Sequence, residues 1–233
     1  MKPSQKPSAK VWELHAFDRR IVVRSKSKEN QMKIIIVGAS GRIGAEVDKA
    51  LSGRHDIVSV GARSGDVQCD YTIPESVRDM FGKIGKFDAL ISVVGGDSIF
   101  KPFANLDDED YRYGFERKFL GQIRFFILGE SCVRDNGSFV FTSGFLSQYP
   151  NLASIATGPL NAAVDTFVKN TASLMTRGVR INVVSPAPIV EPGQEGRGLV
   201  TAAQTAKLYV EAVEGNMTGH VLRAWGGLPV VSD

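Results

Sequence analysis

The chain has 233 residues, of which 43% are hydrophobic and 23% charged, and its formal net charge at pH 7 is +3. This length and apolar content favour one domain with a sizeable core. No apolar stretch approaches the 18 residues of a membrane span. Two distant cysteines and three isolated histidines predict neither a disulfide framework nor a metal site. We therefore expect a cytoplasmic protein in a reducing environment, without a membrane partner and without a metal.

The first 31 residues differ from the rest in charge. Residues 1–31 hold eight Lys or Arg and three acidic residues, a net charge of +5, which leaves −2 for the remaining residues. The basic character therefore belongs to this segment, and the body carries no footprint for nucleic acid. We predict that residues 1–31 form a basic, disordered N-terminal extension. The alternative is that the start codon is assigned too far upstream and that Met32 is the first residue. Residues 32–233 are predicted to form a single domain.

The stretch from Lys33 to Leu51 joins an apolar run, a glycine turn and helical spacing. The run at 34–37 predicts a strand buried on both faces, and the apolar residues that follow recur on one face of a helix. The glycines between them allow a tight bend and let a pyrophosphate approach the amides of the helix N-terminus, whose dipole favours an anion. We predict a dinucleotide site here, with a plain strand-to-helix turn as the alternative. Its residues are Gly38, Ser40, Gly41, Arg42, Ile43 and Gly44.

The second predicted strand, residues 56–61, ends where dinucleotide-binding folds contact the adenosine ribose and distinguish NAD from NADP. An acid at this point accepts from the ribose hydroxyls and would repel a 2′-phosphate. Arg63 and Ser64 follow the strand instead, which favours NADP, and Arg42 offers a second charge to the phosphate. The alternative is that both arginines are merely solvated. Asp70, in a third predicted strand at 67–71, is placed to meet the adenine amino group.

Further helices and strands alternate along the rest of the chain. They are predicted at 74–83 (helix), 87–94 (strand), 107–134 (helix), 137–143 (strand), 160–175 (helix), 179–186 (strand), 201–213 (helix) and 220–223 (strand). The alternation predicts an α/β fold, a Rossmann-type doubly wound parallel sheet of about seven strands in a three-layer α/β/α sandwich. Because ligands bind at the carboxyl ends of such strands, Val94 and Gly95 should line the crevice. The acidic run at 107–110 is interpreted as a helix first turn rather than a metal cluster.

Several short motifs, weak alone but specific in their order and spacing, resemble the short-chain dehydrogenase/reductase family over residues 33–227. They are the Gly38 loop, Asp70-Tyr71-Thr72, residues 88–91 leading to Gly95, residues 137–143 ending in Ser143, residues 179–186 ending in Pro186, and residues 217–227. The resemblance implies a nicotinamide cofactor, contacted also by Tyr71 and Pro186, and a small-molecule substrate. It also implies homodimers or homotetramers built on the long helices after the fourth and fifth strands.

The sequence departs from the family in its catalytic residues. The family uses a Tyr as general acid/base, a Lys four residues later that lowers the pKa of the Tyr, and a Ser that orients the carbonyl. Ser143 matches the serine, but the Tyr and Lys positions fall on Thr157 and Asn161. None of the five tyrosines has a lysine four residues later. The asparagine usual in the helix after the fourth strand is replaced by Lys118.

These departures predict a rearranged catalytic site of Ser143, Lys118, Tyr149 and Asn161. Lys118 offers an ammonium where the charge of the missing lysine acted. Tyr149 offers a phenol from the loop after Ser143, and its alternative is a packed aromatic. Asn161 can donate and accept hydrogen bonds but does not ionise.

Three functions remain open from the sequence. The first is a divergent NADP(H)-dependent oxidoreductase acting on a carbonyl or imine of a small molecule, with the proton supplied by Lys118, Tyr149 or water. The second is a Rossmann protein repurposed for isomerisation or cyclisation, with bound cofactor as a scaffold. The third is a non-catalytic NADP sensor. Retention of Ser143 in a remodelled site favours the first.

Overall fold

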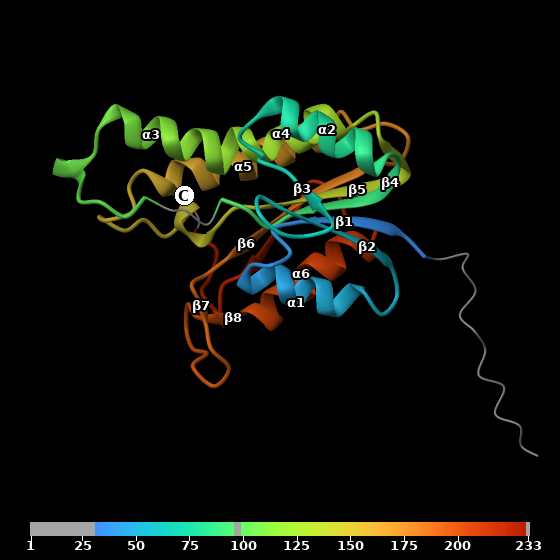
Figure 1. Ribbon diagram of the computed structural model, residues 1–233. Helices are drawn as coiled ribbons and strands as arrows, with labels where there is room; N and C mark the ends of the chain where they lie inside the picture. The colour runs from blue at the N-terminus through green and yellow to red at the C-terminus, as the bar shows by residue number, and fades with distance from the viewer. Residues whose placement is uncertain (1–30, 96–98, 232–233) are drawn as a thin grey trace, which may run out of the picture. The chain divides into compact units, whose positions relative to one another are not determined.

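A seven-stranded parallel sheet forms the centre of the computed structural model, which describes residues 31–95 and 99–231 (Figure 1). The predicted N-terminal extension, except for Gln31, lies outside the described residues. The strand order is β3-β2-β1-β4-β5-β6-β9, and a separate parallel pair joins β7 to β8. The order reverses between β1 and β4, which is the doubly wound arrangement expected from the sequence.

The strands of the sheet are β1 (Lys33–Val37), β2 (Asp56–Gly61), β3 (Val67–Gln68), β4 (Phe87–Ser92), β5 (Val133–Thr142), β6 (Arg180–Pro186) and β9 (Val221–Ala224). The separate pair is β7 (Ile189–Val190) and β8 (Val200–Thr201). The α-helices are α1 (Arg42–Leu51), α2 (Pro74–Ile84), α3 (Asp108–Gly114), α4 (Gly121–Gly129), α5 (Thr157–Ala172) and α6 (Ala202–Glu214). A π-helical segment, η3 (Phe115–Leu120), links α3 to α4, and short 3-10 turns lie at η2 (Phe103–Asn105) and η4 (Phe145–Ser147).

Helices cover both faces of the sheet, α1 and α6 on one and α2, α4 and α5 on the other (Figure 1). Successive residues of β1 point to opposite faces, so Ile34 and Ile36 pack in the core under α1 and α6, while Ile35 and Val37 pack under the other helices. All four are almost completely buried. The apolar run at 34–37 is therefore a strand buried on both faces, as predicted.

Several predicted boundaries were wrong. The third strand ends at Gln68 rather than at 71, and β4 ends at Ser92 rather than at 94. The helix predicted over 107–134 ends at Gly129, since β5 begins at Val133 and not at 137. It is interrupted by the π-helical segment, which no periodicity predicts. The helix predicted at 160–175 is α5, which begins and ends three residues earlier.

The acidic run begins α3 as interpreted from the sequence. Asp107 is the N-cap, its carboxylate accepts from the Asp110 amide at 2.9 Å, and the Asp110 carboxylate accepts from the Asp107 amide at 3.2 Å. This reciprocal capping satisfies two amides that the helix itself cannot bond.

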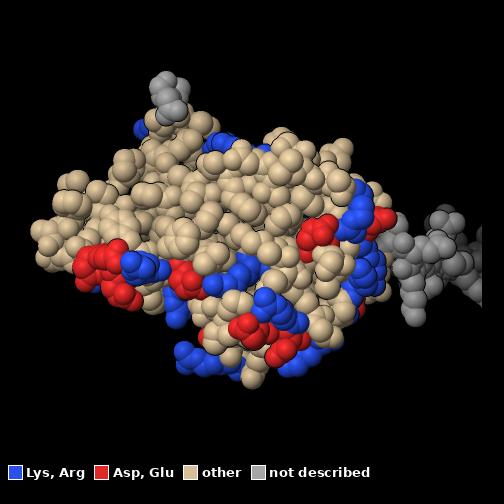
Figure 2. All heavy atoms as spheres, turned by 90° about the horizontal axis from the view of Figure 1, so that it is seen from above, with Lys and Arg blue, Asp and Glu red and all other residues tan. Residues whose placement is uncertain are grey.

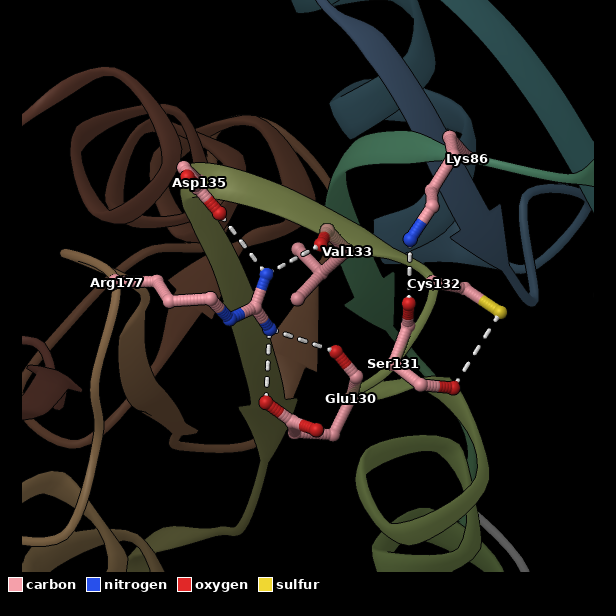
Figure 3. A network of polar contacts seen from close by, with 7 residues as sticks. All are labelled: Lys86, Glu130, Ser131, Cys132, Val133, Asp135 and Arg177. Carbon is pink, nitrogen blue, oxygen red and sulfur yellow. Dashed lines mark hydrogen bonds and ion pairs between the residues drawn. The ribbon is translucent and has the colours of Figure 1, made fainter.

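A polar network lies where the strands of the sheet begin, at the end opposite their carboxyl ends (Figure 3). The Arg177 guanidinium donates to the Glu130 carboxylate and backbone carbonyl, to the Val133 carbonyl and to the Asp135 carboxylate, at 2.8 to 3.1 Å. It thereby joins the turn after α5 to the connection between α4 and β5. These contacts hold the segment after α5 in place, and they take no part in the site at the carboxyl ends of the strands.

Candidate active site

The glycine loop between β1 and α1 has no room for side chains at two positions. Gly38 has a φ of +86°, and a Cβ there would lie 2.5 Å from the Val93 carbonyl oxygen. A Cβ on Gly44 would lie 2.0 Å from the Gly38 carbonyl oxygen. Helix α1 begins at Arg42 without a side-chain cap, so its first amides face outward with the positive end of the helix dipole. This geometry suits a pyrophosphate.

The side chain of Arg42 is engaged away from this loop. Its guanidinium donates to the Ile189 carbonyl at 3.1 Å and forms an ion pair with Glu191 at 2.8 Å. Arg42 thus ties the start of α1 to the segment around β7. Both partners of the pair are largely exposed, so a phosphate would compete with Glu191 for this guanidinium at little energetic cost.

The residues expected near the adenosine lie at the ends of β2 and β3. Arg63 and Ser64 are exposed, and in the described parts of the chain the Arg63 side chain has no hydrogen-bond acceptor or ion-pair partner. The Asp70 carboxylate accepts from the Thr72 hydroxyl at 2.7 Å and amide at 3.0 Å, and these bonds lower the pKa of Asp70. The Tyr71 ring lies against α4, where its centroid is 6.3 Å from that of Phe125.

A cavity of about 340 Å³ opens at the carboxyl ends of β4, β5 and β6. Seven of the residues predicted from the sequence line it together: Ile43, Val94, Gly95, Lys118, Ser143, Asn161 and Pro186. The other walls are mostly apolar: Val93, Phe100, Phe145, Leu146, Ala187, Pro188 and Ile189. The cavity therefore has apolar walls and one polar end, made by Lys118, Ser143 and Asn161.

Lys118 reaches the cavity from the π-helical segment and is only 8% exposed. Its Nζ donates to the Ser143 carbonyl at 2.9 Å. Its stem passes Gly95, where a Cβ would lie 2.8 Å from the Lys118 Cδ, so a larger residue at 95 would displace the lysine. Burial lowers the pKa of Lys118 to about 8, and the Asp165 carboxylate partly offsets this effect.

Gln122 fixes this segment to the ends of two strands. Its amide nitrogen donates to the Lys118 carbonyl at 2.8 Å and to the Thr142 carbonyl at 2.9 Å, and its amide oxygen accepts from the Thr142 amide and the Ser92 hydroxyl. The Thr142 hydroxyl is bonded in turn to the Ser92 carbonyl and the Tyr209 hydroxyl, both at 2.6 Å. Gln122 and Ser92 are fully buried, so the position of Lys118 is set by a rigid polar network.

Ser143 and Asn161 are 3% and 2% exposed, and each has a buried atom without a partner among the described residues. These atoms are the Ser143 Oγ and the Asn161 Oδ1. The Asn161 amide lies against Gly144, where a Cβ would be 2.8 Å from its Nδ2. Buried polar groups are nearly always hydrogen-bonded, so two unpartnered ones at the end of a cavity mark where a ligand would bond.

The structure does not bring Tyr149 together with these residues. Its hydroxyl donates to the Pro229 carbonyl at 2.6 Å, and its ring packs against Phe145 and Trp225. Thr157, at the family's Tyr position, donates to the Ile99 carbonyl at 3.3 Å. The phenol expected from the loop is thus used in fastening the C-terminal segment, and Tyr149 does not line the cavity.

Sequence reasoning missed Asp165, which lies one helical turn beyond Asn161 on α5. One of its carboxylate oxygens is buried without a hydrogen-bond partner in the described part of the protein. A signal was available, because Asp165 is an acid among the buried apolar residues Leu160, Val164 and Val168, and it follows Asn161 at i+4.

A doubly wound parallel sheet, a glycine loop that admits a pyrophosphate and a cavity at the carboxyl ends of the strands define a dinucleotide-binding α/β protein. A sequence profile of the family described as Enoyl-(Acyl carrier protein) reductase matches residues 25–218. The chain belongs to the short-chain dehydrogenase/reductase family and has the fold of its oxidoreductases. No curated protein matches the chain in sequence.

Solved structures agree with this assignment. The protein lin1944 from Listeria innocua is 34% identical over 83% of this chain and 100% of its own, with a TM-score of 0.78. A small-chain dehydrogenase is 25% identical over 85% of this chain and 98% of its own, with a TM-score of 0.77. A small-chain dehydrogenase in complex with NADPH has the same identity and coverage and a TM-score of 0.76.

Two further findings apply to the residues that the structure describes. None of their helices has both the length and the apolar character needed to span a membrane. Within the same residues, no three His, Cys, Asp or Glu side chains gather as a metal site.

Proposed function

We propose that this protein is an NADP(H)-dependent oxidoreductase that reduces the carbonyl or imine of a small, largely apolar molecule. The observation that carries this proposal is the polar end of the cavity, which is lined by the buried Lys118 together with Ser143 and Asn161, whose Oγ and Oδ1 atoms make no hydrogen bond of good geometry among the described residues. A remodelled site that keeps such groups, at a cost in desolvation, is expected where they act on a ligand.

The residues present fit a nicotinamide dinucleotide. The glycine loop and the uncapped start of α1 would hold the pyrophosphate, and Arg63 would pair with a 2′-phosphate. Val94, Gly95 and Pro186 would line the nicotinamide end. The complex of a 25% identical small-chain dehydrogenase with NADPH supports this choice of cofactor. When bound, the nicotinamide would supply a hydride to the substrate.

The chain's own residues would handle the charge and the proton. The Ser143 hydroxyl donates a hydrogen bond to the substrate oxygen or nitrogen, which holds the reacting carbon in place. The Lys118 ammonium stabilises the negative charge that develops on that atom and transfers a proton from its Nζ. A pKa of about 8 suits this role, because Lys118 is mostly protonated at pH 7 but gives up its proton readily.

The shape of the cavity limits the substrate. Apolar walls such as Phe100, Phe145 and Leu146 favour an apolar body with the reacting group at one end. The only cationic group among the described residues that line the cavity is Lys118, so a substrate with several anionic groups would be poorly held inside it.

NADPH oxidation against a panel of quinones, β-keto compounds and imines tests this function. We expect at least one compound to be reduced, and Lys118→Met to lower its turnover by about 10²-fold or more, the usual effect of a positioned acid. Thr157→Ala, at the family's Tyr position, serves as the matched control and should change turnover little. NADPH binding without consumption across the panel would favour a sensor or a non-redox enzyme instead.

We also propose a homodimer or homotetramer formed through the helices on the upper side of the sheet in Figure 1. A broad area of that face carries no Lys, Arg, Asp or Glu (Figure 2). Tyr111, Phe115 and Ile127, on the segment from α3 to α4, are large apolar residues that are 39% to 61% exposed. An uncharged surface with exposed aromatic and aliphatic residues is typical of a subunit interface.

A further inference from the structure

Four buried polar atoms that make no hydrogen bond of good geometry in the described residues lie around the polar end of the cavity. They belong to Ser143 after β5, Ser147 in η4, and Asn161 and Asp165 on successive turns of α5. Helix α5 packs against both η4 and the π-helical segment that carries Lys118. Asn161 lines the cavity whereas Ser147 and Asp165 do not, so the carboxylate lies behind the cavity wall.

Asp165 has charged neighbours but no ion pair among the described residues. Two cations, Lys169 on its own helix and Arg223 on β9, lower the pKa of Asp165 by their charge. The Asp165 carboxylate in turn raises the pKa of Lys118 on the π-helical segment. Burial raises the pKa of Asp165, whereas the neighbouring Ser143 and Ser147 hydroxyls lower it. A half-buried carboxylate that is stabilised by hydroxyls alone, without an ion pair among the described residues, costs stability, so its presence requires an explanation.

We propose that Asp165 is a positioning residue, the counter-charge that acts from behind the cavity wall to keep the Lys118 ammonium protonated, while the Ser147 hydroxyl donates to its carboxylate. Hydroxyl protons rotate to suit their acceptors, so Ser147 can serve Asp165 and leave the proton of Ser143 for a ligand. The role in catalysis rests on the proposed function, but the charge coupling between Asp165 and Lys118 does not.

The arrangement explains how a buried lysine keeps its charge. Burial lowers the pKa of Lys118 because a low dielectric disfavours the ammonium. The same low dielectric strengthens the attraction of a carboxylate that is near but not in contact. Lys169 and Arg223 lower the pKa of Asp165 by their positive charge and so favour its carboxylate form.

A direct titration of Lys118 tests the inference whether or not the protein is a reductase. The full-length protein is labelled with ¹⁵N-lysine, and the Nζ signal of Lys118 is assigned as the one lost in Lys118→Met. We expect Asp165→Asn to lower the midpoint of this signal by about one pH unit, a tenfold loss in proton affinity. Asp79→Asn removes an exposed carboxylate on α2 and should leave the midpoint unchanged. Asp165→Glu, which keeps the carboxylate, should have an Nζ midpoint close to that of the wild type.

An unchanged or raised midpoint in Asp165→Asn would overturn the inference. If that variant does not fold, the coupling is measured from the other side, since linkage is reciprocal. The Asp165 carboxyl, followed by ¹³C shifts, should then titrate at a higher pH in Lys118→Met than in the wild type, and an equal midpoint would overturn the inference as well.

The pH profile of reduction separates this inference from the proposed function. With a substrate from the panel, the alkaline limb of kcat/KM, which reports groups of the free enzyme, should move to lower pH in Asp165→Asn by the same amount as the Nζ midpoint, with KM at neutral pH little changed. A midpoint that moves while the limb stays supports the coupling and refutes Lys118 as the proton donor. The absence of any reducible compound refutes the reductase alone, and the titration still decides on Asp165.

Discussion

Replacing Lys118 by methionine should make the protein more stable at neutral pH. Burial shifts the pKa of Lys118 from 10.5 to about 8. At roughly 1.4 kcal/mol per pH unit, the charged lysine costs the folded state on the order of 3 kcal/mol. Methionine has a similar length and no charge, so it recovers this cost but leaves the Ser143 carbonyl without its donor, a loss of about 1–2 kcal/mol. The expected net gain is about 1–2 kcal/mol at pH 7.

The pH dependence of the gain follows from the sign of the shift. Between pH 8 and 10.5 the unfolded chain binds the Lys118 proton and the folded protein does not. The free energy of unfolding of the wild type therefore rises with pH through this window, and Lys118→Met lacks this rise. The advantage of the variant should be largest below pH 8, should vanish between about pH 9 and 10 where the shrinking charge cost equals the lost hydrogen bond, and should become a deficit of about 1–2 kcal/mol above pH 10.5.

Urea unfolding at pH 7 and at pH 10 measures both effects. Lys33→Met is the matched control, because the Lys33 Nζ also donates to a backbone carbonyl, that of Ile84 at 2.7 Å, but the residue is only half-buried. It should lose about 0.5–1.5 kcal/mol at either pH. A Lys118→Met variant that is less stable than the wild type at pH 7, by a margin that stays constant to pH 10, would refute the reasoning and mark Lys118 as a structural residue.

Three other predictions concern the cofactor, the cavity and the interface. NADPH should bind at least about tenfold more tightly than NADH, and Arg63→Ala should remove most of this preference, whereas equal affinities in the wild type by calorimetry would contradict it. Gly95→Ala should lower stability by about 1 kcal/mol or more and reduce turnover, because residue 95 has a φ of +79° and its Cβ would meet Lys118; unchanged melting and turnover would show that the lysine can move aside. Ile127→Arg should yield monomers in sedimentation experiments, and an unaltered molecular mass would place the interface elsewhere.

The fold could be predicted because local patterns and global topology agree. The buried run of β1, the glycine loop and the alternation of helices with strands each require the same sheet order. Once the order is known, the carboxyl ends of the strands must meet. This is why Val94, Ser143 and Pro186, from three different strand ends, line one cavity in the structure.

The parts that could not be predicted depend on contacts between distant segments. The hydroxyl of Tyr149 bonds a carbonyl 80 residues away, and Arg42 bonds Glu191 at a separation of 149 residues. No local sequence pattern predicts such pairs. The π-helical segment that directs Lys118 into the cavity follows no periodicity of the sequence, and Gln122, which bonds the Lys118 carbonyl, bonds the backbone of a strand 20 residues away as well.

Compared with the family pattern that the sequence resembles, the charges around the cavity are exchanged. The helix that would carry the lysine carries Asn161 and Asp165, and the lysine comes instead from the neighbouring π-helical segment at position 118. Restoring a lysine at 161 alone would therefore not restore the family's site. It would place a second ammonium in the cavity that Lys118 lines, and each ammonium would lower the pKa of the other. Lys118, Gly95, Asn161 and Asp165 thus form one interdependent arrangement, in which the small residue makes room for the lysine and the acid supports its charge.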